Sequence, residues 1–166
     1  MESLCFRISE GIFLHLQKDR DLIIKAELLN RWHGFLSPAP AWVRDYLQGK
    51  RDIYLPWEEL ELNYYSERVL KIYRALKSLT EPGKLISYSQ LGSLAGEHPR
   101  FVAYCMRINR FPLIIPCHRV VAKRGPGGFS YGVRMKLKLI EFEKKLFIRA
   151  QRPHSDTHLC SASGPR

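Results

Sequence analysis

The first third of the chain alternates apolar and polar residues with the two-residue period of half-buried β-strands. Three such stretches follow one another, and short turn segments at 10–11 and 19–21 separate them. They are "LCFRIS" (4–9), "IFLHLQ" (12–17) and "LIIKAEL" (22–28). The pattern predicts three consecutive strands, followed by a short helix over 41–48 that ends at Gly49.

From Ser66 onward the apolar residues recur at the spacing of a helix. The repeating positions are Val69, Leu70, Tyr73, Leu76 and Leu79. Ser66 is a suitable N-cap, and Pro82-Gly83 follows the last apolar position. These signals predict one amphipathic helix between Ser66 and Pro82.

Two shorter helices are predicted next, joined by the tight turn "GEH". Ser87 is the expected cap of the first helix, with Leu91 and Leu94 facing inward. Pro99 begins the second, which continues through "RFVAYCMRI". Two short helices joined by a glycine-containing turn are the signature of a helix-turn-helix.

The last third combines extended segments, a loop and a helix. "PLIIP" (112–116) and "RVVAK" (119–123) are predicted to be extended, and "GPGGFSYG" (125–132) is a glycine-rich loop. "RMKLKLIEFEKKLF" (134–147) predicts an amphipathic helix. Its inward residues are expected to be Met135, Leu139, Phe142 and Leu146.

This order of elements predicts a mixed α/β (α+β) fold with two domains. We expect a small N-terminal αβ domain with its connector at 1–58, and a mostly helical domain with the helix-turn-helix at 59–148. Residues 149–166 contain few apolar side chains and are expected to be a disordered tail.

Hydrophobic residues make up 45% of the 166 residues, which is enough for a core. No apolar run approaches the roughly 18 residues of a membrane span, and the N-terminus lacks the layout of a signal peptide. We therefore expect an intracellular monomer, cytoplasmic or nuclear if eukaryotic, without a membrane partner. The four cysteines are scattered, and the spacing of Cys5, His15 and His33 matches no ligand pattern, so no metal or cofactor is expected.

The net charge of +11 is distributed unevenly along the chain. Residues 1–99 contain 13 Lys and Arg and 13 Asp and Glu, whereas residues 100–152 contain 13 basic residues and only Glu141 and Glu143 as acids. A strongly basic half is the expected signature of a surface that binds a polyanion, above all nucleic acid. A basic surface that serves only solubility is the alternative.

The stretch "LIIPCHRVV" places Cys117 between Pro116 and His118. A free cysteine in an apolar run is often just a small buried residue. Proline, however, disfavours a central strand, and neither His118 nor Arg119 suits an apolar core unless it is paired. An imidazole beside a thiol can raise its thiolate fraction, and Glu143 is a candidate carboxylate to orient that imidazole. An ordinary surface glutamate is the alternative for Glu143.

At these residues the sequence resembles the O6-alkylguanine-DNA alkyltransferases, also called methylated-DNA–protein-cysteine methyltransferases. The resemblance rests on "PCHRVV", preceded by "MRINRFPLII" and "GKLISYSQL", and covers about residues 64–146. The N-terminal third is similar only in layout, as for a variable ribonuclease-H-like αβ domain. The resemblance implies that residues 59–148 bind DNA and carry out alkyl transfer, without a cofactor.

The resemblance also implies the catalytic roles. Cys117 would accept the alkyl group, His118 would deprotonate it through a water, and Glu143 would hold His118. Asn109 would lie at the hinge after the recognition helix and form hydrogen bonds around the cysteine. Tyr88 would contact a phosphate and donate a proton to the departing guanine.

The remaining implied roles concern DNA and the guanine base. Arg100 would enter the duplex where the base has left, Val120 would offer its carbonyl to the base amine, and Ser130 would help bind the guanine oxygen. The residues expected to contact DNA are Tyr88, Arg100, Ala103, Tyr104, Arg107 and Arg119. We also expect Tyr131 to lie in the wall of the base pocket and to exclude large alkyl groups.

The predicted recognition helix departs from the family pattern, which is rich in alanine and glycine. Here it reads "FVAYC", which is bulkier, so either Phe101 and Tyr104 face the core or the docking on the minor groove is altered. Phe129 stands where tyrosine is common, and Tyr131 where glycine is frequent.

The predicted chemistry is the irreversible transfer of an alkyl group from O6-alkylguanine in double-stranded DNA to Cys117. The thioether product is not hydrolysed by water, so each molecule would act once, and the target base must leave the stack first. Two other functions use parts of the same pattern. A non-catalytic helix-turn-helix module or alkylated-base sensor would have no use for an activated thiol, and a cysteine hydrolase would need an oxyanion site that the sequence does not show.

Overall fold

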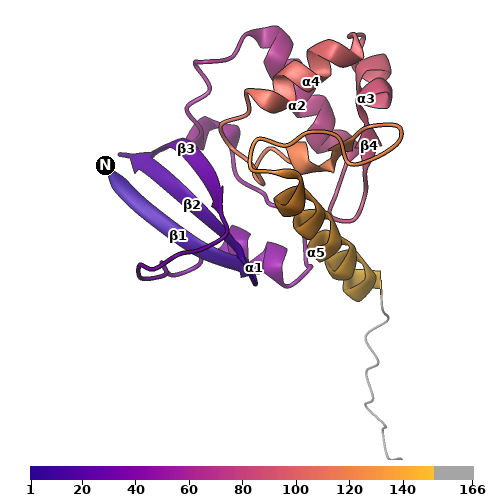
Figure 1. Cartoon of the computed structure of the whole chain (residues 1–166). Helices are drawn as coiled ribbons and strands as arrows, with labels where there is room; N and C mark the ends of the chain where they lie inside the picture. The colour runs from indigo at the N-terminus through magenta and orange to yellow at the C-terminus, as the bar shows by residue number, and fades with distance from the viewer. Residues whose placement is uncertain (152–166) are drawn as a thin grey trace, which may run out of the picture.

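The computed structural model describes residues 1–151 and places a small β-sheet beside a mostly helical half (Figure 1). Strands β1 (Glu2–Ser9), β2 (Ile12–Asp19) and β3 (Leu22–Leu29) form an antiparallel sheet in the order β1-β2-β3. Along β2 the side chains of Ile12, Leu14 and Leu16 are buried while their neighbours are partly exposed. The three strands and the mixed α/β class are therefore as the alternation predicts.

Four helices follow, and their ends match the local signals. They are α1 (Ala41–Leu47), α2 (Glu67–Leu79), α3 (Tyr88–Ala95) and α4 (Pro99–Arg107). Ser66 accepts a hydrogen bond from Val69 N, and Ser87 forms a capping box with Gln90. The backbone of Gly96 adopts φ 71° where α3 ends, a conformation that glycine adopts without strain. The helix-turn-helix of α3 and α4 is confirmed.

The expectation of two extended segments between α4 and the glycine-rich loop is wrong for 112–116 and correct for only part of 119–123. Residues 111–116 form a turn in which Leu113 has φ 71°, and Cys117–Arg119 form one 3₁₀ turn. Only β5 (Val120–Val121) is a strand, paired in parallel with β4 (Ile86–Ser87). Prolines at 112 and 116 cannot donate to a ladder, so the segment follows another path.

The last helix, α5, runs over Val133–Gln151 and extends past the predicted end at residue 147. The expected disorder is thus wrong for 149–151, and the rest of the expected tail, 152–166, lies outside the described residues. Leu94 was expected to face inward but is 66% exposed. Since α3 has only two turns, Leu91 and Ala95 already fill its buried stripe.

β3 is an edge strand of the sheet, and the other half of the chain covers its free side. Ala26 N–H donates to the carbonyl of Arg110 at 2.8 Å, and the Glu61 N–H donates to the carbonyl of Ile23 at 2.9 Å. These bonds satisfy backbone groups that an edge strand leaves unpaired. Within residues 1–151, no helix is both long enough and apolar enough to cross a bilayer.

Candidate active site

Cys117 lies at a cavity of about 340 Å³ that adjoins the recognition helix. The cavity is lined by Tyr88, Ala103, Met106, Arg107, Cys117, Gly128, Phe129 and Ser130. Three separate parts of the chain thus meet there: the start of α3, the exposed side of α4 and the glycine-rich loop. The thiol is reachable from that space although Cys117 is only 5% exposed.

The thiol of Cys117 is a poor nucleophile at rest. Burial raises its pKa to about 11, against a partial lowering by a hydrogen bond from Asn109 and by the charge of Lys136. At pH 7 only about one molecule in ten thousand would carry the thiolate. Chemistry at this sulfur therefore needs a base that takes the proton as the reaction proceeds.

Asn109 shapes the backbone around the cysteine. Its Nδ2 donates to the carbonyl of Ile115 at 2.9 Å, and its Oδ1 accepts from Phe111 N–H at 2.9 Å. The side chain therefore replaces a ladder partner and holds the turn closed. These two hydrogen bonds fix the position of the segment before Cys117 relative to the end of α4.

His118 contacts a buried carboxylate, as the sequence predicts. Its Nε2 lies 2.6 Å from Oε1 of Glu143, and both side chains are essentially inaccessible to solvent. Burial alone would raise the pKa of Glu143, but His118 and Arg119 outweigh it and hold that pKa well below its usual range. Tyr46 also donates its hydroxyl to Glu143 Oε2 at 2.8 Å.

These contacts fix which nitrogen of His118 can act as a base. An ionised Glu143 accepts hydrogen bonds only, so the proton of a neutral imidazole lies on Nε2. Nδ1 then carries the free lone pair, and it is the one buried side-chain nitrogen or oxygen without a hydrogen-bond partner in the described part of the chain. In its neutral form, the residue next to the thiol therefore presents Nδ1 as its unprotonated nitrogen.

Arg119 corrects a sequence-based expectation. It was expected to contact DNA, but it is fully buried, and its guanidinium contacts both oxygens of Glu143 and both oxygens of Asp52 at 2.8–2.9 Å. Lys77 also lies 3.1 Å from Asp52. The fifth N–H lies within 3.5 Å of Thr80 Oγ1, so no donor of Arg119 is left for a phosphate. Its role in the structure is to hold Glu143, and through it His118, against the connector.

Lys136 is the second cation of the site. Its Nζ is buried and donates to the carbonyls of Val120 at 2.7 Å and Gly128 at 3.0 Å. Burial lowers its pKa to about 8, an effect that Cys117 partly opposes. Lys136 thereby joins the cysteine segment to the glycine-rich loop and brings positive charge close to the sulfur.

The family model described as "6-O-methylguanine DNA methyltransferase, DNA binding domain" matches residues 67–145. A methylated-DNA–protein-cysteine methyltransferase of Sulfolobus acidocaldarius is 31% identical over 125 residues, which are 75% of this chain and 73% of that protein. The chain belongs to the methylated-DNA–protein-cysteine methyltransferase family. A relative of the same name from Metallosphaera sedula is 39% identical over 61% of this chain and 64% of its own length.

The matches to the first three relatives span only 49–64% of those proteins' length. Solved structures agree with the fold over more of the chain. The O6-methylguanine-DNA methyltransferase of Pyrococcus kodakaraensis has a TM-score of 0.70 at 24% identity, over 85% of this chain and 97% of that one. Mycobacterium tuberculosis OGT in complex with DNA has a TM-score of 0.67 at 21% identity, over 87% and 93%.

For this methyltransferase family member, the outward side of α4 combines cations with an aromatic ring. Arg100, Ala103 and Arg107 are exposed there, and Tyr104 is 42% exposed. Phe101 is instead partly buried, with the Arg68 guanidinium 3.9 Å above its ring. Phe101 and Tyr104 therefore do not both face the core, as one of the two alternatives required: Tyr104 projects from the helix, and Phe101 packs at its flank.

The pocket residues predicted from the sequence divide into two groups. Tyr88 and Ser130 line the cavity with Cys117, as expected. Val120 and Tyr131 do not. The carbonyl of Val120 accepts from Lys136, and the hydroxyl of Tyr131 donates to the carbonyl of Ala26 at 3.3 Å. The expectation that Tyr131 narrows the pocket directly is therefore wrong, and Phe129 supplies the aromatic wall.

Lys136, Asp52 and Tyr46 are parts of the site that sequence reasoning missed. Lys136 and Glu143 do carry a signal, since both fall at helical spacing on the buried stripe of α5 with Leu139. A lysine or glutamate on such a stripe must be paired. Tyr46 lies in α1 and Asp52 in the connector after it, and the sequence around each of them carries no signal of a contact with Glu143 or Arg119.

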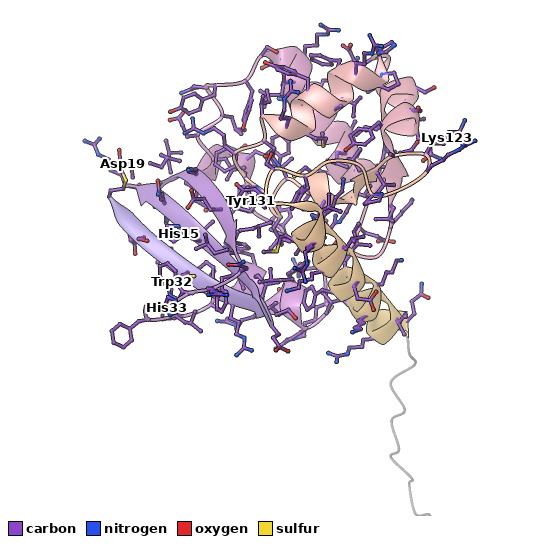
Figure 2. All side chains as sticks on the ribbon, in the orientation of Figure 1. His15, Asp19, Trp32, His33, Lys123 and Tyr131 are labelled. Atoms are coloured by element: carbon purple, nitrogen blue, oxygen red, sulfur yellow. The ribbon has the colours of Figure 1, made fainter. Side chains whose placement is uncertain are left out.

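The histidines of the sheet do not converge on a metal. Both ring nitrogens of His15 are occupied, by Ser3 Oγ at 2.5 Å and Glu27 Oε2 at 3.4 Å, and its ring lies 5.4 Å from that of Trp32 (Figure 2). Among residues 1–151, no three His, Cys, Asp or Glu side chains are grouped as metal ligands.

Proposed function

We propose that this chain transfers an alkyl group from O6 of guanine in double-stranded DNA to its own Cys117, once per molecule. One observation carries the proposal: the thiol and the exposed side of the recognition helix share a single cavity. A helix that contacts DNA there would deliver a base directly to the sulfur. Membership of the methyltransferase family gives the same chemistry.

The reaction follows from the hydrogen bonds around Cys117. His118 Nδ1 takes the thiol proton through an intervening water, while Glu143 holds the resulting imidazolium. The sulfur attacks the alkyl carbon, an S–C bond forms, and the C–O6 bond breaks. The guanine leaves as its anion and takes a proton from Tyr88, which lines the cavity. The thioether persists, so the protein is consumed.

The buried cations serve the charged stages of this reaction. The ammonium of Lys136 stabilises the thiolate, since its charge lowers the pKa of Cys117. Arg119 keeps Glu143 ionised, which keeps Nδ1 of His118 free for the proton. The low concentration of resting thiolate also protects Cys117 from oxidants between encounters with DNA.

DNA enters by way of the basic half of the chain. We propose that α4 lies along the minor groove, with Arg100 replacing the base that turns into the cavity. Unstacking costs a few kcal/mol, which contacts between cations and phosphates offset. A protein with this task acts where genomic DNA is, in the cytoplasm of a prokaryote or the nucleus of a eukaryote.

A test of the proposal is intact-mass spectrometry after mixing the protein with a duplex that contains O6-methylguanine. We expect one added methyl group per molecule, located at Cys117 by peptide mapping. Cys105→Ala is the matched control, because Cys105 is also buried with a pKa raised to about 11 by burial. It should still be methylated, whereas Cys117→Ala should bind DNA without transfer.

The alternative is a non-catalytic DNA-binding module or lesion sensor. The buried pairing of His118 with Glu143 favours the enzyme, because DNA binding alone has no use for it. If the wild-type protein binds the methylated duplex and its mass stays unchanged, the alternative is correct.

A further inference from the structure

The glycine-rich loop needs external anchors to form a wall of the cavity. Gly125, Gly127 and Gly132 all have positive φ values, of 148°, 73° and 93°, a conformation that glycine adopts without strain and other residues rarely do. A Cβ at Gly127 would lie 2.8 Å from the Tyr88 hydroxyl, so this glycine cannot be replaced without displacing that side chain. Phe129 and Ser130, the two cavity-lining side chains of the loop, therefore depend on contacts made around them.

Three side chains hold the loop: Ser130, Lys136 and Tyr131. Ser130 donates its own hydroxyl to the carbonyl of Arg107 on α4 at 3.4 Å. Lys136 holds Gly128 from the side of α5, as described above. Tyr131 holds the other end, since its hydroxyl donates to the carbonyl of Ala26 on β3 at 3.3 Å. The ring of Tyr131 also packs edge-on against Phe129, with 5.7 Å between the centroids. Figure 2 shows Tyr131 between the sheet and the first turn of α5.

Ala26 joins this loop to the segment that carries the cysteine. Its N–H donates to the carbonyl of Arg110, which lies between α4 and Cys117, and its carbonyl accepts from Tyr131. Ala26 is fully buried at the free edge of the sheet. Ala26 is thus hydrogen-bonded both to the segment before Cys117 and to the loop that supplies Phe129 and Ser130 to the cavity.

We propose that Tyr131 is a positioning residue through which β3 sets the distance between Cys117 and the Phe129–Ser130 wall. The inference rests on the proposed alkyl transfer. The N-terminal sheet then has a direct part in the reaction: it is the fixed frame against which both walls of the pocket are aligned. A methyl group, which makes few contacts of its own, depends on this alignment more than a large group that fills a wider pocket.

The test compares Tyr131→Phe, which removes only the hydroxyl, with Tyr54→Phe as the matched control. Tyr54 is 70% exposed and does not line the cavity. For Tyr131→Phe we expect a fall of about threefold to tenfold in the rate of methyl transfer at saturating DNA, the effect of one lost hydrogen bond. Its affinity for the duplex should stay within about twofold, and Tyr54→Phe should match the wild type.

A second readout separates positioning from a loss of folding. The ratio of benzyl to methyl transfer should rise in Tyr131→Phe and rise further in Tyr131→Gly, because the wall moves outward. A lost hydrogen bond that only weakened the fold would slow both substrates equally. Equal slowing, or a fall in DNA affinity with an unchanged rate, overturns the assignment.

The proposed function and this inference fail in different ways. If the wild-type protein transfers no alkyl group from any substrate, the proposed function is wrong. If the wild type transfers and both Tyr131 variants retain its rate and its benzyl-to-methyl ratio, the function stands and the positioning role is wrong. Hydrogen exchange of residues 125–132 should be faster in Tyr131→Phe than in the wild type, and unchanged exchange contradicts the anchor.

Discussion

Replacing Arg119 by methionine should destabilise the protein severely. Methionine keeps much of the length of the side chain but removes the charge and all five N–H donors. The guanidinium makes four hydrogen bonds of 2.8–2.9 Å, two to Glu143 and two to Asp52. After the change Glu143, 1% exposed, is left as a buried carboxylate whose remaining partners are His118 and Tyr46.

The size of the loss in stability depends on how deeply the former partners of Arg119, Glu143 and Asp52, remain buried. Removing one member of a buried ion pair costs about 3–5 kcal/mol, because the other charge stays desolvated without compensation. Asp52 adds less, since its side chain is 19% exposed and keeps Lys77. We therefore expect the free energy of unfolding to fall by about 3–5 kcal/mol and the melting temperature by roughly 10 °C or more.

Urea unfolding followed by circular dichroism measures this change. Arg74→Met is the matched control, because its 3.5 Å pair with Glu67 is exposed, and it should cost no more than about 0.5 kcal/mol. The double variant Arg119→Met with Glu143→Leu should lose less than the sum of the two single changes, since neither change then leaves the other member of this buried pair unpaired. A loss below about 1 kcal/mol for Arg119→Met would refute the reasoning.

Variants of Arg119 also test whether this side chain belongs to the buried network or contacts DNA. Arg119→Lys keeps the charge and should fold better than Arg119→Met. If Arg119 contacted a phosphate, its removal would reduce the salt dependence of DNA binding by about one unit of slope. We expect the slope for Arg119→Met, measured at a temperature at which that variant is folded, to equal that of the wild type, because the buried guanidinium contacts no phosphate. Arg119→Lys should have a reduced rate of transfer because a lysine cannot hold both oxygens of Glu143.

Three further predictions concern the reaction. Arg100→Ala should slow repair of a duplex much more than reaction with free O6-benzylguanine, since only the duplex must be opened, and equal slowing would contradict the assignment. Glu143→Gln should lower the transfer rate at pH 7 by about 100-fold, as His118 loses the carboxylate that keeps Nδ1 free, and a stopped-flow assay measures it. Because burial raises the pKa of Cys117 to about 11, its thiol favours folding below about pH 9, and that contribution is lost as the pH rises through 11. The unfolding free energy should therefore fall less steeply between pH 9 and 11 in Cys117→Ala, and identical slopes would argue against the shift.

The sequence predicts correctly those features of the fold that neighbouring residues determine. The caps Ser66 and Ser87 and the start at Pro99 are signals contained within one helical turn, and all three are correct. Glu143 is named as the partner of His118 because it is one of only two acids in the basic half and because the family resemblance implies that role, and the two side chains do lie 2.6 Å apart.

The errors concern side chains whose partners lie far away along the chain. Arg119 pairs with Asp52, 67 residues earlier, and Tyr131 with Ala26, 105 residues earlier. An arginine in a strongly basic half of the chain suggests a contact with phosphate. Only the structure shows that two carboxylates, one of them far away in the sequence, bind this side chain instead. The turn at Leu113 was missed for a related reason: its positive φ is stabilised by the amide of Asn109, which the apolar run itself does not reveal.

The edge strand β3 also matters during synthesis of the protein. The ribosome completes the three strands long before Tyr131, which follows Ala26 by 105 residues, leaves the exit tunnel. At about 5–20 residues per second, the unpaired backbone of β3 stays open to other strands for roughly 5–20 s. The charged Lys25 and Glu27 on this strand reduce pairing with another nascent chain during that interval. Replacing these two charged residues by neutral ones would leave the folded structure intact but would lower the fraction of synthesised chains that fold.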